Sequence, residues 1–95
     1  MAVVHALRRA GWTARTTREA SGVQRGDDVE TDAPVSIEVK DRAALDLAGW
    51  IRQARDNAGD RPAVVWHKRR GRAAPEEWYV TMTGDDLLRL LEMTR

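Results

Sequence analysis

The stretch VSIEVK, residues 35–40, is the clearest strand in this chain, and the rest of the fold is interpreted outward from it. Apolar and polar residues alternate through it, which is the period of a β-strand whose two faces meet different surroundings. The aliphatic residues are expected to face one side of a sheet, and the polar residues Ser36, Glu38 and Lys40 the other. The sequence therefore predicts a sheet face on which a carboxylate and an ammonium are neighbours.

The segments on either side of this strand alternate between helical and extended patterns. Gly59 and Pro62 follow the longest helical pattern, where a helix is expected to stop. The expected elements are a helix over 2–10, a strand over 12–17, a short extended piece over 28–30, the strand over 35–40, a helix over 43–58, strands over 63–66 and 78–82, and a last helix that begins after Thr83. The order α-β-β-β-α-β-β-α predicts a small α/β fold.

The large apolar residues near the end of the chain are expected to contribute to the core. Thr83 is predicted to cap the last helix, with Asp86 at the third helical position of a capping box. The core face of this helix is expected to consist of Leu87, Leu88, Leu90 and Leu91. The tryptophans are also expected in the core, three on strands and one on a helix: Trp12, Trp66, Trp78 and Trp50.

The composition narrows the class of protein. A chain of 95 residues is expected to form a single domain over residues 1–95. Hydrophobic residues make up 42% and charged residues 33%, which is typical of a folded, soluble domain. The lack of cysteine excludes a disulfide scaffold, a zinc finger and a thiol nucleophile. No apolar run reaches the ~20 residues of a membrane span, and the N-terminus lacks a secretory signal, so we expect a cytoplasmic protein.

The basic residues are mostly arginine. Of the 16 basic residues, only Lys40 and Lys68 are lysines, and the net charge is +1. So small a net charge does not by itself imply nucleic-acid binding.

Glu38 and Lys40 gain a chemical meaning if Asp28 joins them. Asp28 lies ten residues before Glu38, and residues 31–34 can form the turn of a hairpin that brings the two carboxylates together. Two neighbouring carboxylates favour a hard cation such as Mg²⁺, and a lysine beside them can stabilise charge on a phosphate. The alternative is a solvated strand face with a loose ion pair worth at most about 1 kcal/mol.

A basic run follows the strand over 63–66. Arginine and lysine on an exposed loop can bind phosphates, although such runs are also common on solvated loops. The residues of this run are Lys68, Arg69, Arg70 and Arg72. Arg15, Arg18 and Arg25 flank the Ser21-Gly22 turn and are expected near the same groove.

The spacing Asp28-(x)9-Glu38-Val39-Lys40 resembles the signature of the PD-(D/E)xK nucleases, here without the proline beside the aspartate. Other parts of the chain are similar to one branch of that superfamily, the Holliday-junction resolvases of archaeal and phage type and their actinobacterial relatives. The matching words, which cover nearly the whole chain, are Leu7-(x)3-Gly11-Trp12, Ser21-Gly22, residues 25–29, residues 37–40, residues 47–50, Gln53-Ala54, residues 65–71 and residues 78–82.

The resemblance implies a restriction-endonuclease-like core with a central mixed sheet flanked by helices. It implies a Mg²⁺-dependent endodeoxyribonuclease, with Mn²⁺ as a substitute, that cuts branched DNA, most of all four-way junctions, as a homodimer in a bacterial or phage-infected cell. The metal ligands would be Asp28, Glu38 and the Val39 carbonyl, and the catalytic residues Asp28, Glu38, Lys40 and Gln53. The DNA-binding residues would include Arg18, Ser21 and the basic run over 68–72.

The chain departs from the family pattern at its first helix. The family usually carries an acidic residue there, and that position falls at or just before Met1. Either the first helix starts further upstream than this chain does, or the protein has lost one ligand. Loss would leave the alternative of a DNA-binding module with a nuclease fold and no activity. A further alternative is a nuclease that acts on other DNA structures, such as ends or flaps. Asp27 also precedes Asp28, and we prefer Asp28 as the ligand because an apolar residue, Val29, follows it.

Overall fold

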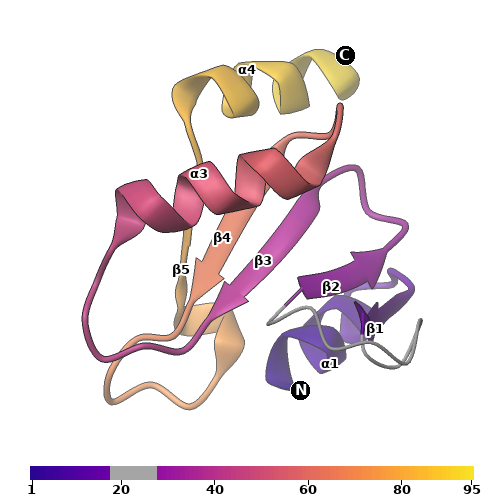
Figure 1. Cartoon of the computed structure of the whole chain (residues 1–95). Coiled ribbons are helices and arrows are strands. Elements are labelled where there is room, and N and C mark those ends of the chain that lie inside the picture. The colour runs from indigo at the N-terminus through magenta and orange to yellow at the C-terminus, as the bar shows by residue number, and fades with distance from the viewer. Residues whose placement is uncertain (18–27) are drawn as a thin grey trace.

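A computed structural model of the chain describes residues 1–17 and 28–95, and shows a five-stranded mixed sheet with helices on both sides (Figure 1). The elements are α1 (Ala2–Arg9), β1 (Ala14–Thr16), β2 (Asp28–Thr31), β3 (Ser36–Lys40), α3 (Leu47–Ala58), β4 (Ala63–His67), the 3₁₀ turn η1 (Pro75–Glu77), β5 (Tyr79–Thr81) and α4 (Gly84–Met93). The α/β class is therefore confirmed, and the order of the elements within the described residues is the predicted one.

The strands lie in the order β1-β2-β3-β4-β5, so each strand pairs with its neighbour in the chain. The β3–β4 pair is parallel, and α3 forms the crossover that such a pair requires. The other pairs are antiparallel. Because β3 and β4 run the same way, both end at one edge of the sheet, where Lys40 lies opposite His67.

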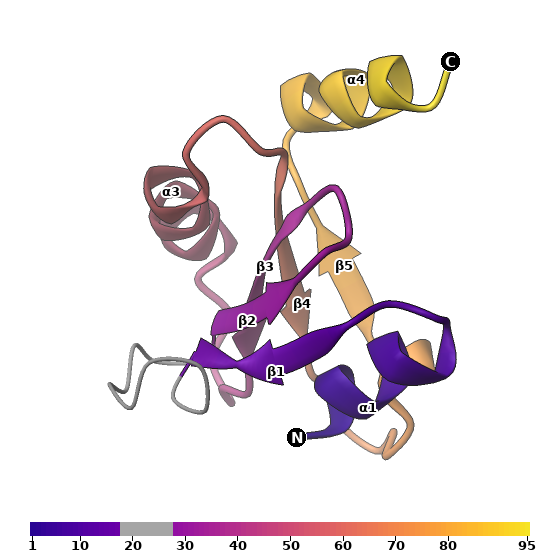
Figure 2. The ribbon, with the colours of Figure 1, turned by 90° about the vertical axis from the view of Figure 1, so that its right-hand side faces the viewer.

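The alternation in β3 separates two cores on opposite faces of the sheet. Ile37 and Val39 pack with the buried face of α1 in the first core. In the second core, Trp50 and the alanines of α3 pack on Ala63 and Val65 of β4. Figure 2 shows α1 and α3 on opposite sides of the sheet. Glu38 and Lys40, which alternate with the first-core residues, therefore lie on the α3 side.

The helix α3 starts later than the sequence predicts. It was expected over 43–58 but begins at Leu47, because the Asp46 side chain caps it by accepting a hydrogen bond from the Gly49 amide at 3.2 Å. Residues 41–46 instead form an exposed connection that leaves the end of β3. Because α3 begins at Leu47, the helix does not fill the space beyond Lys40, which is described below as a pocket.

Two of the predicted core tryptophans lie outside the strands. Trp12 is 42% exposed, because it belongs to the connection that leaves α1 at Gly11 and precedes β1. Trp78 ends η1 and donates its indole N–H to the Arg72 carbonyl at 2.8 Å, and β5 begins only at the next residue. Trp50 is buried as predicted, and Trp66 packs partly buried against the first core.

The predicted core face of the last helix is wrong. Leu87, Leu88 and Leu91 are 43%, 68% and 52% exposed, and no residue of α4 belongs to either core cluster of the described chain. In Figures 1 and 2, α4 stands beyond the end of the sheet instead of covering one of its faces.

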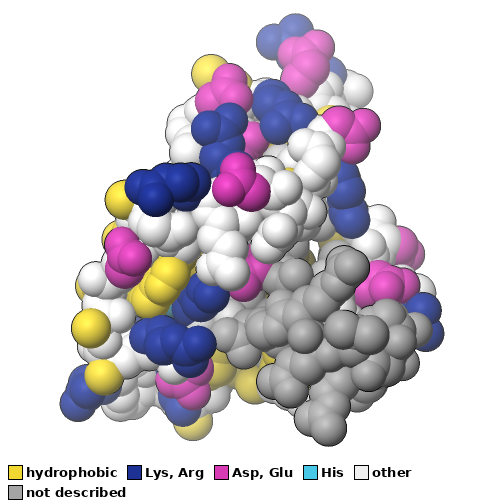
Figure 3. Space-filling view, in the orientation of Figure 1, with side chains coloured by type: hydrophobic (Ala, Val, Ile, Leu, Met, Phe, Trp, Pro, Cys, Tyr) yellow, Lys and Arg dark blue, Asp and Glu magenta, His cyan; other side chains and the backbone are white. Residues whose placement is uncertain are grey.

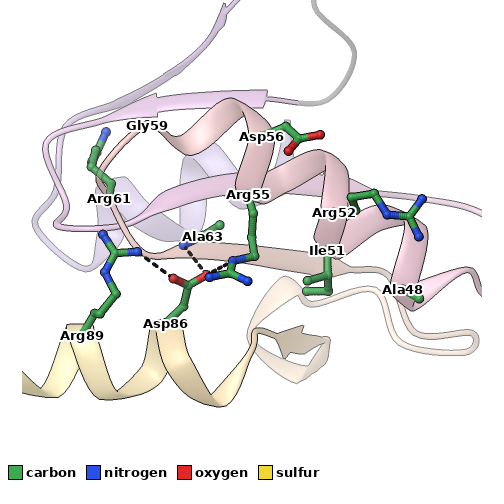
Figure 4. Close-up of a pocket in the computed structure, with 10 residues that line it drawn as sticks. All are labelled: Ala48, Ile51, Arg52, Arg55, Asp56, Gly59, Arg61, Ala63, Asp86 and Arg89. Atoms are coloured by element: carbon green, nitrogen blue, oxygen red, sulfur yellow. Dashed lines mark hydrogen bonds and ion pairs between the residues drawn. The ribbon is translucent and has the colours of Figure 1, made fainter.

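Polar contacts hold α4 in place. Thr83 caps the helix as predicted, by accepting from the Asp86 amide at 3.1 Å. The other half of the predicted capping box is wrong, because the Asp86 carboxylate is taken up by other partners. The Asp86 carboxylate, 1% exposed, binds Arg55 of α3 at 3.2 Å and Arg89 of α4 at 2.8 Å, and accepts from the Ala63 amide at 3.3 Å (Figure 4). One buried carboxylate thus joins α3, β4 and α4.

Candidate active site at the β3–β4 edge

The candidate site starts from the register between β2 and β3. Asp28 pairs with Glu38 across this antiparallel hairpin, as the sequence predicts. Residues directly opposite each other in an antiparallel pair share a sheet face, with Cβ atoms about 4.5–5.5 Å apart. The register therefore brings position 28 next to Glu38, and Asp27 lies outside the described residues.

Glu38 and Lys40 form a buried ion pair. The Lys40 Nζ lies 3.3 Å from Glu38 Oε1, and the two side chains are 9% and 3% exposed. The alternative of a solvated strand face is therefore wrong. The burial comes from α3, which covers this face of the sheet, and sequence alternation by itself does not reveal it.

Gln53 joins the pair from α3. The Lys40 ammonium donates a hydrogen bond to Gln53 Oε1 at 3.0 Å, so residues from β3 and α3 meet as expected for the site. Gln53 is exposed, which means that this contact lies where the buried pair meets the surface. Val39 turns its side chain into the opposite core, so only its backbone can take part in the site.

His67 lies opposite Lys40 and ends β4, one residue beyond the predicted strand. Its ring is 5.9 Å from the Trp50 ring, and its Nε2 lies 2.8 Å from Thr81 Oγ1. Burial lowers the pKa of His67 from its ordinary value, so the imidazole is neutral at pH 7. The spacing of residues in the sequence gave no reason to connect His67 to the site, because the parallel pairing of β3 and β4 is what brings it close to Lys40.

The basic run begins at this same edge. The Lys68 amide donates to the Lys40 carbonyl at 2.9 Å, so the loop that joins β4 to β5 leaves the sheet beside the candidate site. Lys68, Arg70 and Arg72 are exposed, and the Arg69 guanidinium lies 4.5 Å from the centre of the Tyr79 ring. Arg18, Ser21 and Arg25 lie outside the described residues, and Arg15 instead pairs with Glu30 at 3.1 Å.

A groove runs along α3 on the side that faces α4, and three of its arginines make contacts within the protein. This groove of about 480 Å³ is the one shown in Figure 4. Arg55 and Arg89 are held by Asp86, and Arg61 donates to the carbonyls of Thr31 and Ala33. Because these arginines already bind protein acceptors, the groove fits a role in attaching α4.

Within residues 1–17 and 28–95, no group of three or more His, Cys, Asp or Glu side chains is arranged to hold a metal ion. In the same part of the chain, no helix is long and apolar enough to cross a bilayer. Comparison of the chain with protein-family models, with curated proteins and with solved structures finds no match.

Proposed function

We propose that this protein is a Mg²⁺-dependent endodeoxyribonuclease with a restriction-endonuclease-like core, and that it cuts branched DNA, with four-way junctions as its preferred substrate. The observation that carries the proposal is the buried Glu38–Lys40 pair, which lies opposite position 28 and is completed by Gln53. A buried ion pair adds little net stability because both ions lose their hydration. An ion pair that costs this much hydration energy and lies where β3 and β4 end is better explained by a chemical role than by a contribution to stability.

The donor set fits Mg²⁺ in the way this ion is usually held. Mg²⁺ keeps several waters and needs only one or two carboxylates together with phosphate oxygens of the substrate, so a closed cage of protein ligands is not required. Asp28, Glu38 and the Val39 carbonyl would hold it, since positions 28 and 38 are paired and Val39 follows directly. When bound, Mg²⁺ acidifies a coordinated water and neutralises charge on the phosphate.

Lys40 is the residue of this chain best placed to act on the reacting phosphate. Its ammonium has three N–H donors, of which one reaches Gln53 and another faces Glu38. For the third, the described part of the chain shows no acceptor, and we propose that it binds a water or a phosphate oxygen. Gln53 and Glu38 fix the direction of the ammonium, so it is already oriented when charge develops on the phosphate.

The neighbouring loop provides the charge that a DNA backbone needs. Lys68, Arg70 and Arg72 are exposed on a loop whose first amide is bonded to the Lys40 carbonyl. Arginine binds phosphate through two donors, and such contacts weaken as the salt concentration rises. The net charge of +1 hides this local concentration of positive charge.

The proposal is tested by incubating the protein with labelled four-way junction, flap and linear duplex DNA, in Mg²⁺ or in EDTA. We expect paired, symmetric nicks in the junction, in Mg²⁺ only. Equal cutting of all three DNAs would contradict the preference for junctions. Asp28→Ala should abolish the nicks and Asp27→Ala should not, since position 28 is paired with Glu38; the opposite result would overturn the ligand assignment.

One observation favours a second candidate, a DNA-binding module without catalytic activity. The helix α1, Ala2–Arg9, has no acidic residue, whereas the family that the sequence resembles usually places one there. This candidate predicts metal-independent binding of the junction with no cleavage. The same assay therefore separates the two functions.

Cutting a four-way junction symmetrically needs two copies of the site, related by a two-fold axis. The surface that fits this role is the exposed apolar face of α4: Leu87, Leu88 and Leu91. The helix has Asp85 in its first turn and Arg95 just beyond its end. In two copies packed antiparallel, each aspartate would lie near the arginine of the other copy. Since Asp85 already binds Arg55 and Arg95 already lies 3.5 Å from Glu92, the apolar contacts would contribute most to the interface. This face of α4 lies near Ala63, where β4 begins, whereas the candidate site lies near His67, where β4 ends (Figure 1).

Leu88→Glu is expected to make the protein monomeric. A helix of ten residues is about 15 Å long and falls short of the ~800 Å² per partner of a standard interface, so the wild-type dimer should dissociate measurably on dilution. Sedimentation velocity over a range of concentrations measures this. Leu45→Glu is the matched control, because Leu45 is also exposed, at 69%, and lies elsewhere. A Leu88→Glu protein that sediments like the wild type would exclude this interface.

A further inference from the structure

A pocket opens beyond the ends of the two parallel strands. It has a volume of about 640 Å³ and is lined by residues that follow β3 and β4, among them Arg42, Leu45 and Lys68. In open α/β sheets, ligands are bound outside the carboxyl ends of the parallel strands. The pocket is within the size range of small-ligand sites, which is about 300–1,000 Å³.

The pocket combines an aromatic wall with a basic rim. The Tyr79 ring is 57% exposed, and the His67 ring lies 6.3 Å away in an edge-to-face arrangement that supports it from the sheet side. Leu45 adds an apolar side chain that is 69% exposed. The cations of the rim are Arg42, Lys68, Arg69 and Arg70, and Asp41 also lines the pocket, with its carboxylate 3.9 Å from Lys68 Nζ. The Arg69 guanidinium lies 4.5 Å from the centre of the Tyr79 ring, so a base that stacks on Tyr79 shares the ring with this cation. Figure 3 shows basic and hydrophobic side chains side by side where the chain leaves β3 and β4.

This combination is specific for one kind of ligand. A planar ring with cations around it binds a planar, anionic group, and in nucleic acids that group is a nucleotide, whose base stacks while its phosphate meets arginine. A paired base in a duplex keeps both faces covered by its neighbours. An unpaired base can leave the stack at little cost in free energy, and one of its faces then becomes available to an aromatic ring of the protein.

The pocket lies beside the candidate active site. Lys68, on its rim, is bonded through its amide to the Lys40 carbonyl, and His67, behind Tyr79, lies opposite Lys40 in the register. A nucleotide held here would belong to the strand whose phosphate lies near Lys40.

We propose that this pocket binds one unpaired nucleotide next to the cleaved phosphate, with its base stacked on Tyr79 and its phosphate held by the basic rim. The inference rests on the proposed nuclease function and adds a reason for its substrate preference. Base stacking is interrupted at a branch point, so a nucleotide can enter the pocket there most easily. The protein thereby selects branched DNA by capturing a base and needs no particular base sequence.

The test measures binding in EDTA, which separates it from cleavage. The probes are a labelled duplex with one unpaired nucleotide, the same duplex with an abasic unpaired position, and the fully paired duplex. We expect the wild type to bind the duplex with the unpaired nucleotide about tenfold more tightly than the abasic and the fully paired duplex. This factor is what the stacking of one base on an aromatic side chain typically contributes to affinity. Tyr79→Ala should remove this preference and leave binding of the paired duplex unchanged, whereas Tyr79→Phe should keep it.

Equal binding of the three probes by the wild type would overturn the inference. So would a Tyr79→Ala protein that keeps the preference, or one that binds all three DNAs equally less well, since the ring would then only support the basic loop. Thermal unfolding of each variant verifies that it is folded. If the wild type prefers the unpaired nucleotide but cuts no DNA, the proposed nuclease function is wrong and the nucleotide-binding role of the pocket is kept. If it cuts DNA without this preference, the nuclease function is kept and the nucleotide-binding role is wrong.

Discussion

Lys40→Ala is expected to lower the rate of junction cleavage by a factor of about 10²–10³, the loss found when one preorganised donor to a developing charge is removed. The variant removes the ammonium that Glu38 and Gln53 orient. The measurement is a single-turnover assay on the labelled junction in Mg²⁺, together with the affinity for the same DNA in EDTA. Affinity should change little, because the proposal assigns most of the phosphate contacts to the exposed cations of the basic loop.

The controls for Lys40 address burial and shape. Glu38, 3% exposed, would lose its cation in Lys40→Ala, so unfolding must be measured for each variant. Lys40→Arg keeps the charge, but a planar guanidinium does not fit a site shaped for a compact ammonium, so we expect it to be nearly as inactive. Lys68→Ala is the matched lysine control and should weaken DNA binding while leaving the single-turnover rate at saturation unchanged. Full activity of Lys40→Ala would refute its catalytic role.

Asp86→Ala is expected to lower the free energy of unfolding by about 2–3 kcal/mol, the size of hydrogen bonds to a charged group. Its carboxylate binds Arg55, Arg89 and the Ala63 amide, and these contacts attach α4 to the rest of the molecule. Arg55 and Arg89 are partly exposed and can turn to water, so the loss should stay below that of a fully buried pair. Urea unfolding followed by tryptophan fluorescence measures the effect.

The neighbouring aspartate provides a matched control. Asp85 also binds Arg55, at 3.1 Å, but its side chain is 68% exposed. Asp85→Ala should therefore change stability by less than about 1 kcal/mol, as for other surface ion pairs. Equal effects of the two substitutions would show that burial at Asp86 contributes nothing to the attachment of α4.

Patterns among neighbouring residues in the sequence were sufficient to predict most of the helices and strands. The alternation in β3, the end of α3 before Gly59 and the Thr83 cap all depend on neighbours in the chain, and all are confirmed. The failures concern long-range packing. Leu87, Leu88 and Leu91 form an amphipathic pattern, but a pattern states which face is apolar and not what covers it. For the same reason, the sequence did not reveal Asp86 as a buried link between α3 and α4.

The candidate site shows the same division. The sequence by itself determined that Glu38 and Lys40 share a face of one strand, because side chains alternate with a period of two. It also indicated the hairpin that pairs Asp28 with Glu38. Only the tertiary structure decided that α3 buries the pair and contributes Gln53, and that the parallel register brings His67 and the basic loop to Lys40. The physical reason is that helix–sheet packing and parallel pairing join residues far apart in the chain, where no local pattern records which partners meet.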